Sequence, residues 1–314
     1  MYETCLKLEL IPIITHSGTI NHPQNISFVS NFAMQLIPYG SDTMKDNPKA
    51  KPEFYDYFML LDGYGSTSSW FRNGKIPEDK LLAIIDHHDV EDDKPKANYS
   101  DIRKTGAASS IFAEYLKDGL DTLFEKEELE NIATGLFLGI MKDTDNLVKR
   151  VQPLDWAMHQ YLYPLRKSSV VDDVINTKNS KEFMNLKYKA LLETLYEDGT
   201  SFACVGWIPE ELRGVVAEVA DAMMEVENTH TAYSIGILPE IIDVSIRSDK
   251  SSYEFKRIEE KFPERKGGGG KFGAWRLVLP NQFTEESYIK PCDSNKDNLQ
   301  ELIYSEFKKR VCDK

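Results

Sequence analysis

Asp86, His87 and His88 follow the apolar run "LLAII" without an intervening residue. A carboxylate and two imidazoles offer oxygen and nitrogen ligands, and together they suit manganese or iron better than calcium. Taken alone, adjacent histidines after an aspartate are often part of a polar loop in solvent. The tripeptide becomes a metal site only if further ligands of the same kinds converge on it.

Other aspartates and histidines that could bind a metal ion occur in the first half of the chain, two of them directly after an apolar or helical run. Asp62 ends the apolar run "YFMLL", and Asp143 follows the helical run "GLFLGIMK". His16 and His22 belong to the first ninety residues, which hold four of the six histidines. Asp62 is also open to interpretation as a turn or helix-capping residue, and Asp143 as a loop carboxylate.

A glycine run near the end of the chain forms a second candidate site. Consecutive glycines let backbone N–H groups approach an anion, and the lysine after them adds a positive charge, so we expect a phosphate-binding loop. It is not a P-loop, because the Ser or Thr after the lysine is missing. Arg247 and Ser248 would add a cation and a hydroxyl. The alternative is a flexible linker. The run consists of Gly267, Gly268, Gly269, Gly270 and Lys271.

The first half of the chain alternates short apolar runs with helical patterns. That alternation predicts a doubly wound parallel sheet flanked by helices. The carboxyl ends of neighbouring strands meet at one edge of such a sheet, and ligands bind there. We therefore expect His16, Asp62 and residues 86–88 to converge. The predicted strands are residues 8–16, 55–62 and 80–88, and the predicted helices are residues 25–37, 107–116 and 129–141.

The length of 314 residues predicts two domains with a cleft between them. Residues 1–180 form the expected metal-binding domain, with a charged connector helix that begins near residue 167. Residues 194–314 form a smaller mixed α/β domain that would bind substrate. Its predicted strands are residues 200–208, 231–240, 241–248 and 274–280, and its predicted helix is residues 210–226.

The composition limits the partners. A net charge of −13 would repel long nucleic acid, whose binding depends on many Lys and Arg contacts to phosphate, so a phosphorylated substrate should be small. The acidity could equally serve solubility alone. The four cysteines form no CxxC pair, which argues against a zinc ribbon or a disulfide framework. The sequence holds no apolar run of membrane-spanning length, and we expect a cytoplasmic protein.

Six features in this order resemble the DHH phosphoesterases that carry a C-terminal DHH-associated domain. None of the six is specific alone, but their order and spacing are. They are strand-end Asp62, "AIIDHH", "TGAASSIFAEYL", "GIMKDTDNL", "SIRS" and "GGGGK", spread over roughly residues 10–280.

The resemblance implies a hydrolase of phosphate esters or anhydrides that uses one or two divalent ions, usually Mn²⁺, with Mg²⁺ and Co²⁺ as alternatives. Asp86, His87 and His88 would be the catalytic residues, with His88 near the phosphate. Arg247, Ser248, Gly267 to Gly270 and Lys271 would hold the substrate. The implied metal ligands are His16, His22, Asp62, Asp86, His87 and Asp143.

Two positions depart from the family's pattern. The family's first motif is a histidine followed at +4 and +6 by aspartate, whereas His16 is followed by Ile20 and His22. An imidazole could replace the second aspartate, but Ile20 has no ligand atom. Lys271 stands where the family has histidine after its four glycines, and it keeps the positive charge.

We therefore expect a metal-dependent phosphoesterase that hydrolyses phosphodiester or phosphomonoester bonds. Its partner would be a short oligonucleotide, a dinucleotide or a small phosphorylated nucleotide, with no long nucleic acid and no membrane. A homodimer is one option for its assembly. The altered first motif leaves two alternatives: a degenerate family member that binds a nucleotide with little hydrolysis, and a phosphatase of small anhydrides.

Overall fold

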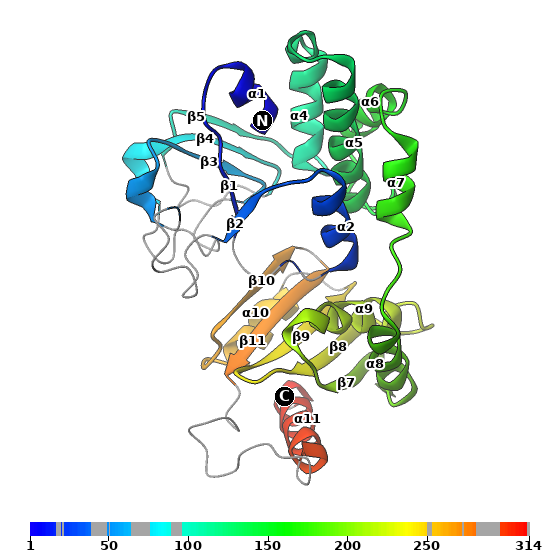
Figure 1. Ribbon diagram of the computed structural model, residues 1–314. Helices are drawn as coiled ribbons and strands as arrows, with labels where there is room; N and C mark the ends of the chain where they lie inside the picture. The colour runs from blue at the N-terminus through cyan, green and yellow to red at the C-terminus, as the bar shows by residue number, and fades with distance from the viewer. Residues whose placement is uncertain are drawn as a thin grey trace. The chain divides into compact units, whose positions relative to one another are not determined.

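The chain folds into two compact units, seen in the computed structural model (Figure 1). The first unit comprises Met1–Ile20 and Gln24–Thr177, and the second comprises Asn21–Pro23 and Lys178–Lys314. Across the ranges described, no helix has the length and apolar character needed to cross a membrane. The structure describes residues 1–16, 20, 22–38, 49, 51–63, 76–88, 96–249, 253–271, 273–280 and 296–312.

The strands of the first unit pair in parallel, which confirms the predicted sheet type. β4 (Leu81–Asp86) lies between β3 (Phe58–Leu61) and β5 (Tyr99–Ile102), and β1 (Ile14–His16) pairs with β2 (Leu36–Pro38). Five of the six residues of β4 are buried. A strand covered on both faces reads as a continuous apolar run, which is why the sequence predicted β4 well.

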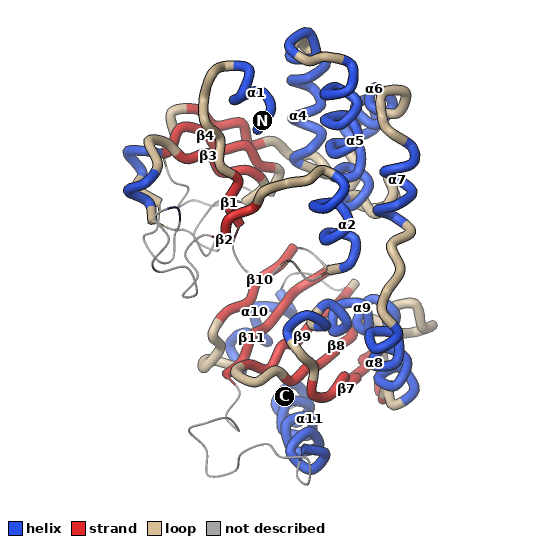
Figure 2. Tube along the Cα trace, viewed as in Figure 1, coloured by secondary structure: helices blue, strands red, loops and turns tan. Residues whose placement is uncertain are grey.

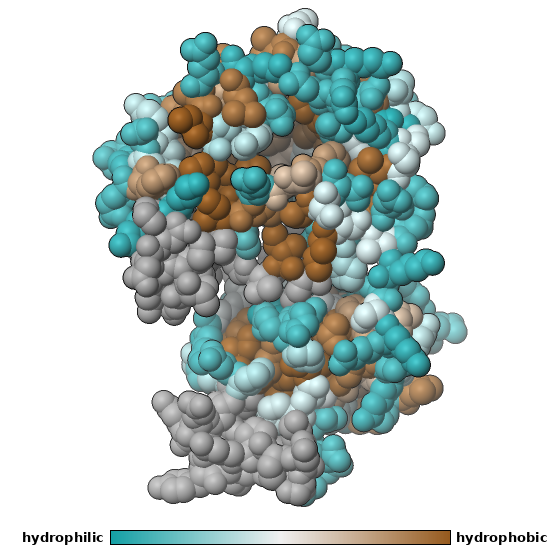
Figure 3. Space-filling model, viewed as in Figure 1, coloured by the Kyte–Doolittle hydropathy of each residue, from teal (hydrophilic) through white to brown (hydrophobic). Residues whose placement is uncertain are grey.

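Helices make up the rest of the first unit. Residues of α4, α5 and α6 build one apolar cluster, which includes Leu116, Phe137 and Leu162. Figure 2 shows these helices in blue. Hydrophilic residues cover most of the outer helical surface in the view of Figure 3, as expected for helices with one buried face. The helices are α1 (Tyr2–Lys7), α2 (Pro23–Asn31), α4 (Ala108–Lys117), α5 (Lys126–Asp143), α6 (Pro153–Leu162) and α7 (Ser168–Ile175), with short 3-10 turns η3 (Pro52–Phe54), η4 (Glu78–Lys80) and η5 (Leu120–Leu123).

The prediction of one helix over residues 25–37 was wrong. The helix ends at Asn31, and residues 36–38 form β2 instead. The chain leaves the helix through Ala33, which has φ 47°, and the Met34 N–H donates to the Val29 carbonyl at 3.0 Å. Such a left-handed helix ending normally uses glycine or asparagine, so the sequence gives no sign of it.

A six-stranded mixed sheet forms the second unit, in the order β10-β11-β9-β8-β7-β6. Only the β7–β8 pair is parallel among the described strands of this sheet. The strands predicted at residues 200–208, 231–240, 241–248 and 274–280 are confirmed. The strands are β6 (Leu195–Glu197), β7 (Thr200–Trp207), β8 (Thr231–Ile237), β9 (Ile241–Ser248), β10 (Gly267–Lys271) and β11 (Ala274–Pro280).

Helices cover both faces of this sheet. α8 (Lys181–Leu192) and α9 (Gly214–Met223), which follows the 3-10 turn η6 (Glu210–Leu212), pack on one face. α10 (Tyr253–Lys261) and α11 (Lys296–Cys312) pack on the other. Alternation along the strands supplies the two cores, because neighbouring side chains point to opposite faces.

Asp243 is a buried carboxylate in the second unit. It accepts hydrogen bonds from Arg213 at 2.9 Å and from Arg276 at 2.6 Å, in both cases measured to Nε. Burial raises the pKa of Asp243, but the two arginines more than offset that effect and hold the pKa below its usual value. The ionised carboxylate therefore stabilises the folded state at neutral pH.

Replacing Asp243 with asparagine should lower the free energy of unfolding at neutral pH by about 2 to 3 kcal/mol, less than for a fully buried pair because Arg276 is half exposed. The folded pKa is depressed, so the difference from the wild type should shrink as pH falls below about 3.9, the ordinary pKa of aspartate. Urea denaturation at several pH values measures both effects. A difference that stays constant down to acid pH would contradict the charge-based explanation.

The glycine run is a strand and not the expected loop. Gly267 to Lys271 form β10, which pairs antiparallel with β11 at the edge of the sheet. Gly268 has φ 143°, and a Cβ there would lie 2.5 Å from the carbonyl oxygen of Arg276. Strand pairing alone thus requires glycine at residue 268.

Gly268→Ala should destabilise the protein by about 1 to 3 kcal/mol, because the change combines a disfavoured φ with a backbone collision. Gly267→Ala is the matched control, since a Cβ at residue 267 meets no atom within 4 Å. Chemical denaturation of both variants checks the contrast. Equal stabilities would mean that β10 does not hold this geometry.

Candidate metal centre

Two parallel strands bring the candidate ligands together at their carboxyl ends. Asp86 is the last residue of β4, His87 and His88 follow it, and Asp62 comes directly after β3. The Asp62 N–H donates to the Ile85 carbonyl at 3.0 Å, which extends the pairing of the two strands to the site. One ligand atom from each of Asp62, Asp86, His87 and His88 lies within 4.8 Å of the others.

The two carboxylate oxygens of Asp86 have different surroundings. Oδ1 accepts hydrogen bonds from the backbone N–H groups of His87 at 2.6 Å and His88 at 3.0 Å, and it lies 2.6 Å from His88 Nδ1. Oδ2 is buried and has no hydrogen-bond partner among the described residues. Burial raises the pKa of Asp86, but the bonds from His88 and His87 outweigh burial and leave the pKa below its ordinary value. Asp86 is thus held as an anion through Oδ1, and its Oδ2 is left to bind a cation.

His87 is held by one ring nitrogen and presents the other to carboxylates. Its Nδ1 lies 3.1 Å from the Thr105 carbonyl, so Nδ1 carries the proton, because a carbonyl can only accept. Its Nε2 lies 3.2 Å from Asp62 Oδ1 and 4.0 Å from Asp143 Oδ2. Burial lowers the pKa of His87, yet the hydrogen bond and charge of Asp62 outweigh it and raise the pKa above its ordinary value.

This arrangement fits a divalent cation. The carboxylates of Asp62 and Asp143 both face His87 Nε2, and the Oδ2 of Asp86 has no hydrogen-bond partner among the described residues, so a bound cation would offset the repulsion between these carboxylates. Imidazole nitrogen with carboxylate oxygen is a donor set suited to Mn²⁺ and related ions. Asp143, the last residue of α5, is a further expected ligand, and its Oδ2 faces His87 Nε2.

The structure does not bring His16 and His22 into this cluster. His16 ends β1, and its Nδ1 is buried without a hydrogen-bond partner among the described residues. His22 belongs to the second unit, where its Nε2 lies 3.7 Å from Glu218 Oε1. Residues 17–19 and 21 of the first motif lie outside the described ranges.

The predicted substrate-binding residues occupy neighbouring strands of the second unit. Lys271 is paired with Ala274, and Ala274 with Arg247, so the three lie in one row across β10, β11 and β9. The Arg247 guanidinium donates to Asp221, with Nε 2.6 Å from Oδ1. The Ser248 hydroxyl is buried, and it donates to the His230 carbonyl at 3.1 Å.

Thr105, whose carbonyl accepts from His87 Nδ1, has no predicted role in the sequence. The segment "TGAASSIFAEYL" contributed to the family resemblance, but a backbone carbonyl leaves no mark on residue type. Asp155, which binds the Thr105 hydroxyl at 2.7 Å, was also missed. Its place three residues after Gln152, with Pro153 between, is typical of a helix start, yet its burial is not visible in the sequence.

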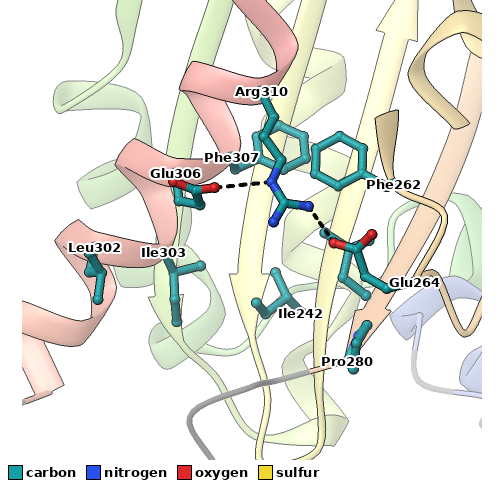
Figure 4. Close-up of a pocket in the computed structure, with 10 residues that line it drawn as sticks. Ile242, Phe262, Glu264, Pro280, Leu302, Ile303, Glu306, Phe307 and Arg310 are labelled. Carbon is teal, nitrogen blue, oxygen red and sulfur yellow. Dashed lines mark hydrogen bonds and ion pairs between the residues drawn. The ribbon is translucent and has the colours of Figure 1, made fainter. Parts of the chain in front are cut away.

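A pocket of about 270 Å³ lies elsewhere in the second unit, between α11 and the sheet (Figure 4). Its walls are mainly apolar, with Phe262, Ile303 and Phe307 among them. Arg310 is bonded to Glu264 and to Glu306. Because two carboxylates already engage its cation, this pocket is poorly suited to a phosphate.

Comparisons with known proteins support the architecture. No family model matches the chain. An uncharacterised protein of Methanocaldococcus jannaschii is 28% identical over 300 residues, which make up 95% of this chain and 56% of that protein. The chain thus spans little more than half the length of this curated relative.

A solved exopolyphosphatase-related protein of Bacteroides fragilis is similar over 96% of this chain and 93% of its own, with a TM-score of 0.59 and 14% identity. A putative family II inorganic pyrophosphatase of Methanococcus jannaschii (18% identity, 96% and 93% covered) and the exonuclease RecJ bound to manganese (12%, 98% and 92%) have TM-scores of 0.41 and 0.45, too low to bear on the fold. The similarity to the Bacteroides fragilis protein extends over nearly all of both chains. The chain shares the α/β fold of this exopolyphosphatase-related protein.

Proposed function

We propose that this protein is a metal-dependent phosphoesterase that hydrolyses phosphodiester or phosphomonoester bonds of short oligonucleotides or dinucleotides. One observation carries the proposal. Asp62, Asp86 and His87 converge at the ends of β3 and β4, with an Asp86 oxygen that no described residue satisfies. Such a set binds a divalent cation, and the fold matches that of an exopolyphosphatase-related protein.

Each residue has a distinct task in the proposed reaction. A bound cation would lower the pKa of water and neutralise charge on the phosphoryl oxygens. Asp62, Asp86, His87 and Asp143 would hold Mn²⁺, with Mg²⁺ or Co²⁺ as alternatives and one or two ions bound. His88, fixed through Nδ1 on Asp86 Oδ1, would turn its other nitrogen to the phosphate.

The substrate-binding residues are proposed on the resemblance and on their register. Lys271 and Arg247 would neutralise phosphate charge, and Arg247 would share its guanidinium between the phosphate and Asp221. The net charge of −13 favours a small substrate, because an acidic protein repels a long polyanion.

A second candidate function is nucleotide binding with little hydrolysis. The observation that favours it is the first motif: Ile20 has no ligand atom, and the Nε2 of His22 faces Glu218. One of the two metal positions of the family would then lack its usual carboxylates. Under this alternative, the protein binds a nucleotide tightly and turns it over slowly.

A substrate panel tests the proposal. The full chain is assayed with Mn²⁺, Mg²⁺ and Co²⁺ against pApA, short oligoribonucleotides, cyclic dinucleotides, 3′-phosphoadenosine 5′-phosphate, pyrophosphate and polyphosphate. Metal-dependent release of nucleotide from pApA or the oligoribonucleotides supports the proposal. Binding of these compounds by calorimetry without turnover supports the alternative. Turnover of the anhydrides alone would identify a small-anhydride phosphatase and overturn the proposed substrate class.

A further inference from the structure

We infer that Asp155, a buried carboxylate outside the proposed ligand set, positions His87 for metal binding. The inference rests on the proposed metal site. Asp155 is fully buried and accepts four hydrogen bonds. Its Oδ1 accepts from the hydroxyls of Thr105 at 2.7 Å and Ser110 at 2.5 Å. Its Oδ2 accepts from the backbone N–H groups of Gly106 and Gln152, each at 2.7 Å.

Thr105 connects this carboxylate to the metal site. Its side chain donates to Asp155, and its carbonyl accepts from His87 Nδ1 at 3.1 Å. With Nδ1 protonated, His87 has its lone pair on Nε2, the atom that faces Asp62 and Asp143. The partner of the outer nitrogen selects the tautomer and the ring orientation of a metal-binding histidine. Asp155 therefore fixes the tautomer and the ring orientation of His87 through Thr105.

Asp155 connects the stretch from Thr105 to Ser110 with the start of α6. Its hydrogen bonds hold the turn at residues 105–106, the first turn of α4 through Ser110, and the start of α6 through Gln152. The approach is so close that a Cβ at residue 106 would lie 2.6 Å from Asp155 Oδ2, which explains the glycine there. None of the four donors is a cation, so the carboxylate depends on all of them to offset its burial.

Isosteric variants separate positioning from general stability. Thr105→Val removes the hydroxyl and keeps the carbonyl, and Thr105→Ser restores the hydroxyl. Asp155→Asn keeps the shape of the side chain and removes its charge. Thr134→Val is the matched control in the same unit, because it deletes a buried hydroxyl that accepts from the Lys167 N–H and has no bond to Thr105 or Asp155.

The first measurement is made on metal-free protein. Nitrogen-15 chemical shifts of the histidine rings, with His87 assigned by His87→Gln, report the tautomer at a pH where the ring is neutral. We expect the Nδ1–H form in the wild type, in Thr105→Ser and in Thr134→Val, and a mixture of tautomers in Thr105→Val and Asp155→Asn. This result does not depend on metal binding or activity.

The second measurement is Mn²⁺ affinity by calorimetry. Changes in the groups behind a metal ligand typically weaken binding about tenfold to a hundredfold, and we expect losses of that size in Thr105→Val and Asp155→Asn, with recovery in Thr105→Ser. Thr134→Val should lower only the stability. If both test variants keep the wild-type tautomer and Mn²⁺ affinity while unfolding more easily, Asp155 is structural and the inference is wrong. If the wild type binds no Mn²⁺, the proposed function fails, and the tautomer alone decides the positioning role.

Discussion

Asp86→Asn is expected to reduce Mn²⁺-dependent hydrolysis by about a thousandfold, which corresponds to about 4 kcal/mol of transition-state stabilisation. Asparagine can keep the bonds that Asp86 Oδ1 accepts from the N–H groups of His87 and His88. Its amide nitrogen then replaces Oδ2, the oxygen left for the cation. The variant should therefore fold, lose Mn²⁺ affinity and lose turnover together.

The burial of Asp86 makes asparagine a better choice than alanine, because alanine would also strand two backbone N–H groups. Asp118→Asn, the same chemical change at an exposed position in the same unit, is the control and should behave as the wild type. His87→Ala removes a second proposed ligand and should cause the same loss of Mn²⁺ affinity and turnover. Near wild-type turnover at saturating Mn²⁺ in either site variant would show that the metal is held elsewhere.

Lys271→Ala should lower kcat/KM by about tenfold to a hundredfold, because one charge-assisted contact to a phosphate contributes about 1.5 to 3 kcal/mol. Mn²⁺ affinity should not change, because every proposed ligand in the cluster belongs to the first unit. Lys271→His should recover part of the loss, and more of it at low pH, where imidazole is charged.

Lys266→Ala is a matched control for Lys271→Ala. Lys266 precedes the same strand at its other end, is exposed and carries the same charge. Substrate titrations at fixed Mn²⁺ compare the two variants. Equal kinetics in both would mean that Lys271 binds no phosphate and that β10 serves only as a sheet edge.

The convergence of Asp62 with residues 86–88 could be predicted from the sequence because these residues follow apolar strands. β4 is buried on both faces, so its residues form an unbroken apolar run that stops at Asp86. Parallel pairing with β3 then places Asp62 nearby without any further information. Residue type and strand topology are enough for such a site.

Other parts depend on information that residue types do not carry. β5 is a polar edge strand with two exposed residues, Tyr99 and Ser100, so it has no apolar signal. The glycine run predicted a phosphate-binding loop because consecutive glycines let backbone N–H groups approach an anion, whereas pairing with β11 holds the run extended. His22 was placed by counting from His16, but the fold puts its Nε2 beside Glu218, nearly two hundred residues along the chain. Tertiary contacts decide all three.

The backbone conformation of Asp62 connects the proposed metal site with the thermal stability of the protein. Its φ of 57° costs about 1 kcal/mol in a residue with a Cβ, and the bond to the Ile85 carbonyl holds it there. Glycine at this position would relieve the strain and delete a ligand. Selection for thermal stability alone would therefore favour glycine at residue 62, whereas selection for turnover would retain the aspartate at the expense of stability. Under the proposed function, Asp62 is the result of the second kind of selection.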